Sequence, residues 1–135
     1  MEARIHSLVK KLPVKSLLVW SLALVFIVFG ALKIFDLGPV AVYVSEMVPL
    51  MASALAIKLL GTIELLLGVG LLIKKVRFWA AMAIAAHLMG IFLLSLLNLH
   101  LLLDQAGVTL FGEFVMKNIV LVATALFSAA NADSQ

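Results

Sequence analysis

The chain has 135 residues, of which 65% are apolar and 13% are charged, and its mean hydropathy is +1.25. A soluble domain is about 45–50% apolar and about 25% charged, and so short a chain lacks the interior volume to bury the excess. The composition therefore excludes an ordinary soluble domain and a disordered chain, and it indicates one integral membrane domain. The absence of cysteine excludes disulfides, thiol catalysis and iron–sulfur ligation.

Four apolar segments follow one another along the chain, at residues 16–35, 50–73, 78–103 and 114–130. A helix of about 20 residues crosses a hydrocarbon core, and the absence of water there requires the backbone to bond to itself. The apolar residues run continuously, without the alternation of a membrane barrel. The sequence thus predicts an all-α fold, an antiparallel four-helix membrane bundle formed by residues 1–135 as one domain.

Basic residues are distributed unevenly between the two sides of this bundle. They gather before the first span and in the turn between the second and third spans, and they are Arg4, Lys10, Lys11, Lys15, Lys74, Lys75 and Arg77. The opposite loops, 36–49 and 104–113, contain no Lys or Arg. By the positive-inside rule, both termini are expected in the cytoplasm, and the net charge of +3 is a membrane pattern rather than a nucleic-acid signal.

Two shorter segments have an amphipathic pattern. Residues 1–12 read as an interfacial helix with Ile5 and Leu8 on its apolar stripe, and a frayed basic tail is the alternative. In the first outer loop, Tyr43, Val44 and Met47 share one face, which predicts a short helix at the outer interface.

Each span carries a stripe of small or polar residues at helical spacing. Close contact between such residues drives helix association in lipid, so the stripes are expected to face inward. They are Ala23, Phe26, Gly30 and Lys33; Gly61, Glu64 and Gly68; Ala83, His87, Gly90, Leu94 and Asn98; and Lys117, Leu121, Thr124 and Ser128, with Asn118 beside them.

Ionisable residues inside a membrane are costly and need a partner or a purpose. At about 1.5 Å per residue, Glu64 and His87 lie at similar heights near the midplane. We expect them to pair and to relay a proton, with Asn98 as a further buried polar candidate. A neutral hydrogen bond that only fixes the register of the helices is the alternative.

A second group of polar residues is expected at the outer mouth of the bundle. Lys33, Lys58 and Lys117 fall within about 5–10 Å of the outer boundary by the same helical rise. Three lysines there suggest a site for an anionic or carbonyl-bearing ligand. Snorkelling to the interface is the alternative, above all for Lys58. Other candidates in this group are His100, Glu113 and Asn118, and no spacing of residues predicts a metal site.

Three stretches carry a family resemblance: SLALVFIVFGALKIFDLGP, GTIELLLGVGLLI and GEFVMKNIVLVATAL. Together they resemble the DoxX-like small membrane proteins, especially the YkgB-like branch. The resemblance implies a four-helix prokaryotic inner-membrane protein. It also implies a subunit of a thiosulfate:quinone oxidoreductase or of an assembly that handles oxidative stress. The matching positions are Gly30, Lys33, Gly61, Glu64, Gly112, Glu113, Lys117 and Asn118.

These observations leave three functional hypotheses. The first is a quinone-linked redox module that receives electrons from a partner oxidoreductase subunit. The second is a non-catalytic membrane anchor or assembly subunit whose polar core is structural. The third is a small transporter, which needs a homo-oligomer because one four-helix bundle has little room for a pore. We assign no catalytic residue, and quinone is the one cofactor that the sequence suggests.

Overall fold

The computed structural model describes residues 12–37, 40–48 and 53–132. Four long helices dominate it: α2 (Val14–Ile34), α4 (Ala54–Leu72), α5 (Arg77–Leu97) and α7 (Leu110–Ala130). Each is long and apolar enough to cross a membrane. The smaller elements are helices α3 (Val40–Met47) and α6 (Leu99–Leu102) and a hairpin of β1 (Leu103–Asp104) and β2 (Gly107–Val108). The helix predicted for residues 1–12 lies almost wholly outside the described residues.

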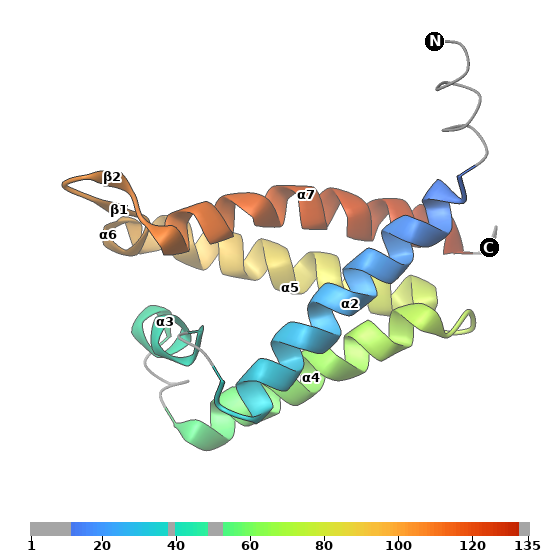
Figure 1. Cartoon of the computed structure of the whole chain (residues 1–135), viewed down its shortest axis with the longest axis horizontal. Helices are drawn as coiled ribbons and strands as arrows, with labels where there is room; N and C mark the ends of the chain where they lie inside the picture. Colours follow the sequence, from blue (N-terminus) through green and yellow to red (C-terminus); the bar gives the residue numbers. More distant parts are fainter. Residues whose placement is uncertain (1–11, 38–39, 49–52, 133–135) are drawn as a thin grey trace, which may run out of the picture.

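The four long helices run antiparallel and form two pairs (Figure 1). Helix α2 packs mainly on α4, and α5 packs mainly on α7. In Figure 1 the α2–α4 pair diverges from the α5–α7 pair toward the left, and α3 lies in the wedge between them. We call this side the α3 end. The opposite side, which holds the turn at residues 73–76 and the last turn of α7, is the basic-turn end.

Helix α7 begins earlier than the predicted start at residue 114. Thr109 acts as its N-cap, and the side-chain Oγ1 accepts a hydrogen bond of 2.9 Å from the backbone N–H of Gly112. The same hydroxyl donates to the backbone oxygen of Leu101 at 2.6 Å. A Cβ on Gly112 would lie 2.4 Å from the backbone oxygen of Leu102, so glycine lets α7 start directly against α6.

The predicted third span, 78–103, is wrong at its end, because α5 stops at Leu97. The chain turns through α6 and then through the hairpin, where Asp104 Oδ1 accepts a hydrogen bond of 2.7 Å from the N–H of Ala106. Gly107 closes the turn at a φ of +123°, which side chains disfavour. Hydropathy does not reveal where the chain turns back, because residues 99–103 are all apolar except His100.

Helices α2 and α4 approach each other closely through two glycines. A Cβ on Gly30 would lie 2.6 Å from the Gly61 backbone oxygen, and a Cβ on Gly61 would lie 2.7 Å from the Gly30 oxygen. Neither position therefore admits a side chain without moving the helices apart. Gly68 repeats the contact farther along, where a Cβ would lie 2.9 Å from the Ala23 oxygen. The predicted inward stripes of the first two spans are confirmed by this packing and by the burial of their members.

The predicted stripe of the third span is confirmed in part, because His87, Gly90 and Leu94 line the cavity at the α3 end, but no member of the stripe is fully buried. Ala83 and Leu94 are exposed, and the buried face of α5 carries Ala81, Ile84 and Leu88 instead. A small residue in a membrane helix lies at a helix–helix interface only where a second helix packs against it. Here α5 packs mainly against α7, and to a lesser extent against α4.

The predicted stripe of the fourth span contains a similar error. Lys117 is exposed, whereas Asn118, the next residue, is buried together with Val115 and Ala125. Neighbouring residues point about 100° apart on a helix, so Asn118 and not Lys117 faces inward. Ser128 is buried and Leu121 lines the cavity, as the stripe predicts.

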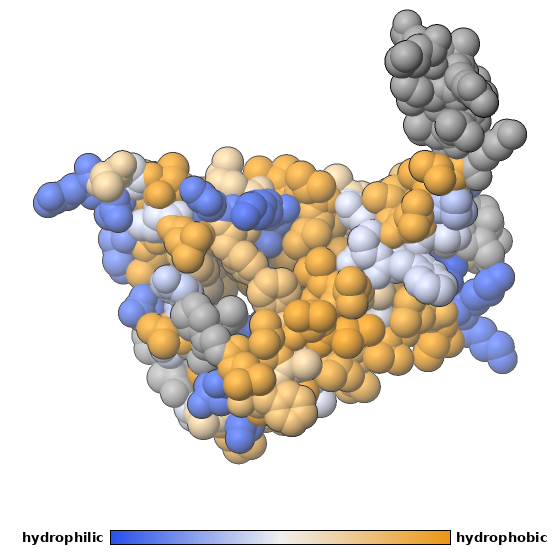
Figure 2. All heavy atoms as spheres, viewed as in Figure 1, coloured by the Kyte–Doolittle hydropathy of each residue, from blue (hydrophilic) through white to orange (hydrophobic). Residues whose placement is uncertain are grey.

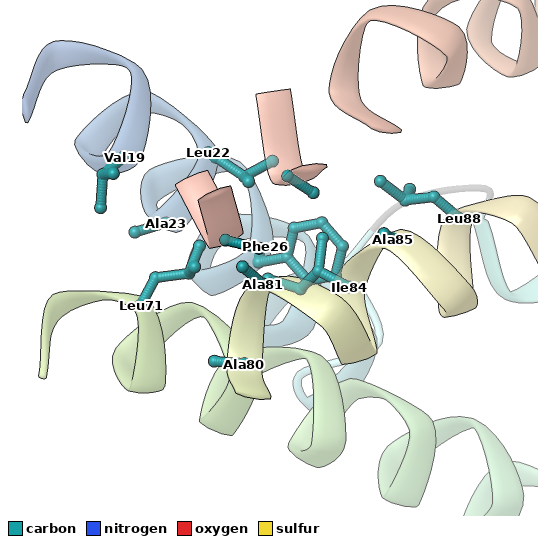
Figure 3. Packing of buried hydrophobic residues seen from close by; sticks show 12 residues of the cluster. Val19, Leu22, Ala23, Phe26, Leu71, Ala80, Ala81, Ile84, Ala85 and Leu88 are labelled. Atoms are coloured by element: carbon teal, nitrogen blue, oxygen red, sulfur yellow. The ribbon is translucent and has the colours of Figure 1, made fainter. Parts of the chain in front are cut away.

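Most of the buried apolar residues form one cluster, whose members are drawn in Figure 3. It includes Val19 and Leu22 of α2, Leu71 of α4, Ile84 of α5 and Ala125 of α7. Many large apolar side chains of the four long helices are exposed, and on the face shown in Figure 2 polar residues gather mainly toward the two ends. A chain that is apolar inside and outside is typical of a bundle that lipid surrounds.

Candidate functional site

Glu64 lies at the centre of a buried polar network that joins three helices. Its Oε2 accepts a hydrogen bond from Lys33 Nζ of α2, and its Oε1 lies 3.0 Å from Nε2 of His87 on α5. The side chains of Lys33 and Glu64 are 6% and 5% exposed. Both oxygens of the carboxylate are thus engaged, which a buried charge requires.

The direction of side chains on antiparallel helices explains the contact between Lys33 and Glu64. Each residue lies three positions after one of the paired glycines, Gly30 and Gly61, so the two backbones meet beside them. Side chains tilt toward the N-terminus of their own helix. On antiparallel helices this tilt brings Lys33 and Glu64 toward each other. The ammonium therefore lies deeper in the bundle than the Cα position of Lys33 suggests.

His87 reaches Glu64 because α4 and α5 form a hairpin. The two residues stand nearly the same number of positions before and after the turn at residues 73–76, so they lie at the same level. The predicted contact between Glu64 and His87 is therefore present. The ring of Phe26 packs edge-on against the imidazole at 6.1 Å between centroids. This contact holds the ring while 20% of the His87 side chain stays exposed.

The network borders a cavity of about 310 Å³, which lies within the size range of small-molecule sites. Helices α2, α3, α4, α5 and α7 all contribute to its walls, which are mainly apolar. Aromatic rings are prominent among the lining side chains, and they are Phe26, Phe29, Tyr43, Phe111 and Phe114. Lys33, Glu64 and His87 all line the same cavity. The site therefore combines flat apolar walls with one charged, hydrogen-bonding region.

Helix α3 covers the cavity from the α3 end. The ring of Tyr43 stacks on Phe111 with 4.6 Å between centroids and 17° between planes. Ser95 Oγ donates a hydrogen bond to Met47 Sδ at 3.3 Å. The predicted apolar face of this short helix thus turns toward the cavity, where Tyr43, Val44 and Met47 are lining residues.

Asn118 of α7 is a further polar side chain at this cavity. It is 2% exposed, and its amide nitrogen Nδ2 has no hydrogen-bond partner among the described residues. Buried side-chain donors are nearly always paired in folded proteins. The unpartnered amide of Asn118 therefore needs an explanation, which a ligand in the cavity would supply.

The other predicted site residues lie apart from this cavity. Lys58, His100, Glu113 and Lys117 are exposed, and the described structure has no ion pair between Glu113 and Lys117. Asn98 is half-buried at the end of α5, where its Nδ2 donates to the Leu94 oxygen at 2.9 Å. Of the predicted outer group, the structure brings Lys33 and Asn118 to the cavity together with Glu64 and His87.

Two buried polar residues were not singled out as internal from the sequence. Arg77 is 5% exposed, and its Nε donates a hydrogen bond of 2.8 Å to the backbone oxygen of Leu71 near the end of α4. A cation at a helix C-terminus complements the helix dipole and closes the α4–α5 turn. Ser95 is fully buried beneath α3, and the signal that marks it is only its spacing of eight residues from His87.

No group of three or more His, Asp or Glu side chains in the described ranges is placed to hold a metal ion. In comparisons with known proteins, no family model, no curated protein and no solved structure matches this chain. The chemistry of the cavity itself therefore carries the functional argument.

Proposed function

We propose that this chain is a multi-pass membrane protein that binds a lipid-soluble quinone beside the Lys33–Glu64–His87 network, as the membrane module of an oxidoreductase. The observation that carries the proposal is a charged network buried at the wall of an apolar cavity. Four apolar helices with apolar outer surfaces support membrane embedding. A charge there costs at least about 2.5–3.5 kcal/mol, so its retention favours a functional purpose.

The residues at the cavity fit a quinone ring. Aromatic walls at Phe29, Phe111 and Phe114 offer faces and edges for stacking against a flat ring. Lys33 carries three N–H donors, of which Glu64 uses one, and the others suit a carbonyl oxygen. A bound quinone would supply the redox chemistry, since it takes up a pair of electrons with their protons.

Each member of the network has a distinct task in this proposal. The ammonium of Lys33 balances the negative charge of Glu64, so that the carboxylate stays ionised inside the bundle. Glu64 Oε1 orients the imidazole of His87 by accepting from Nε2, and His87 is the proton-carrying group of the network. In this proposal the electrons come from a partner oxidoreductase subunit, and a chain without cysteine has no thiol of its own to supply them.

The location is part of the same proposal. The excess of basic residues on one side of the bundle favours a cytoplasmic location for both termini. The resemblance to DoxX-like proteins favours a prokaryotic inner membrane. The α3 end then faces outward. The resemblance to DoxX-like proteins favours this location and a redox partner or a second copy of the chain, and it favours a role in oxidative stress.

Purification with native lipids and quinones retained tests the proposal. We expect quinone at a near-stoichiometric ratio in the wild-type protein and a clear loss of it in Glu64→Gln. Lys58→Gln is the matched control, because Lys58 lies on the same helix as Glu64 but is exposed. Equal quinone contents in Glu64→Gln and Lys58→Gln, or no quinone in the wild type, would contradict the proposal and favour the anchor function.

A further inference from the structure

Asn118 lies where two hollows of the protein meet. It lines the main cavity, and it also lines a smaller hollow of about 160 Å³ between α5 and α7. The other residues of that hollow are apolar: Met89, Phe92, Ile119 and Val122. A single buried amide thus stands between the polar network and an apolar groove.

The groove opens on the outer surface of the α5–α7 pair. Met89 is 44% exposed and Ile119 is 51% exposed, although both line the hollow. A hydrocarbon chain fits such a channel, whereas a charged or strongly hydrated group would lose its water there without compensation. The groove therefore suits the apolar tail of an amphiphile.

The amide of Asn118 suits the head of the same molecule. Its Nδ2 is a donor without a partner among the described residues, so it selects an acceptor oxygen. The terminal torsion of an asparagine side chain is soft, so the amide is free to reorient when a ligand binds. We propose that Asn118 is the residue by which the cavity selects its ligand. Its amide donates a hydrogen bond to a carbonyl oxygen of an amphiphile whose apolar tail lies in the α5–α7 groove.

This inference rests on the proposed function and deepens it. A quinone with a hydrocarbon tail has both features, a carbonyl oxygen and an apolar chain. The proposal therefore assigns one carbonyl to Asn118 on α7, and leaves Lys33 and His87 to the proton-carrying side of the site. Asn118 acts as a positioning and specificity-determining residue.

Binding of two matched probes to the purified full chain in detergent tests the proposal. The probes are decyl-para-benzoquinone and decylbenzene, which share the tail and a six-membered ring but differ in the carbonyl oxygens. We expect the wild type to prefer the quinone, and Asn118→Leu to weaken quinone binding about tenfold, the effect of one buried hydrogen bond. Decylbenzene binding should stay within about twofold, because leucine keeps the number and the branching of the heavy atoms in the asparagine side chain.

Infrared difference spectra of the carbonyl-labelled quinone provide a signature that a merely structural role would not move. The hydrogen-bonded carbonyl band should be present in the wild type and absent in Asn118→Leu. The ligand-free Asn118→Leu protein should melt at or above the wild-type temperature, because it removes an unpartnered buried donor. An unchanged band, an unchanged preference or a variant that fails to fold would overturn the proposal, the last because it would show a structural role for the amide.

The outcomes separate this inference from the proposed function. If Glu64→Gln retains quinone while Asn118→Leu loses the preference for it, the redox proposal fails and the specificity role of Asn118 stands. If Glu64→Gln loses quinone and Asn118→Leu keeps the preference, the role of Asn118 fails alone.

Discussion

The two ends of the bundle are built from the same four helices, but one end is closely packed and the other encloses a cavity. Toward the basic-turn end, Val19, Leu22 and Leu71 pack with alanines of α5 and α7 in a closed apolar cluster (Figure 3). Toward the α3 end, the helix pairs diverge around a cavity that aromatic and charged side chains line (Figure 1). Small residues allow close approach, whereas rings and the inserted α3 keep the helices apart. Packing alone explains the closed end, but it does not explain three polar groups and an unpartnered amide at the cavity.

The largest expected effect comes from breaking the buried ion pair at the cavity. Lys33→Met keeps an unbranched side chain one atom shorter but leaves the Glu64 carboxylate without its cation. We expect the free energy of unfolding in detergent to fall by about 3–5 kcal/mol, the typical cost of stranding a buried charge. Circular dichroism during denaturant titration measures it. The double variant Lys33→Met with Glu64→Gln should recover much of the loss.

The exposed Lys58 provides the control for this measurement. Lys58→Met should change stability by no more than about 0.5 kcal/mol, as surface substitutions do. If Lys33→Met and Lys58→Met cost the same, the polar network contributes nothing to the fold. The two ends of the bundle would then differ only in how closely their side chains pack.

The next effect concerns how closely α2 and α4 approach. Gly61→Ala places a Cβ 2.7 Å from the Gly30 oxygen and forces the helices apart, at a cost of about 1–3 kcal/mol. Gly90→Ala is the matched control, because a Cβ there meets nothing within 4 Å. It should raise stability by up to about 1 kcal/mol through helix propensity. Thermal unfolding of both variants measures the difference, and equal effects would show that the α2–α4 contact is loose.

Much of this architecture was predictable from the sequence, because hydropathy and length decide which segments become long apolar helices. The pair Glu64–His87 was also predictable, since a tight turn fixes the heights of residues on either side of it. Lys33 was predicted at the mouth because helical rise gives only the depth of a Cα. A lysine side chain that leans back along its helix reaches Glu64 well below that level.

The register of α7 was less accessible to sequence reasoning. Lys117 and Asn118 are adjacent and polar, and the choice between them depends on which face meets α5 and α2. A stripe of Leu121, Thr124 and Ser128 is compatible with either choice. Only the packed structure shows that Asn118 faces inward and Lys117 faces outward.

A smaller effect is expected from loosening the cover of the cavity. Tyr43→Leu removes the stacking on Phe111, which is worth about 0.5–1.5 kcal/mol. Because α3 contributes little to the closed end, the change should be local. Hydrogen exchange should accelerate in the amides of α3 and stay the same in α4 and α5. Glu46→Gln, an exposed change on the same helix, should leave exchange unaltered. Equal acceleration throughout the bundle would show that α3 supports the whole fold.

The smallest effect is expected at Lys117, and it is the sharpest check on the register of α7. Lys117 is exposed and points away from the cavity, so Lys117→Gln should shift unfolding by less than about 0.5 kcal/mol. Quinone retention should also equal that of the wild type. Asn118→Leu, one residue away, should instead weaken quinone binding while leaving the fold intact. Loss of quinone in Lys117→Gln would mean that α7 is rotated in the membrane relative to this structure. The ligand-facing residue would then be the lysine, as the sequence stripe alone indicates.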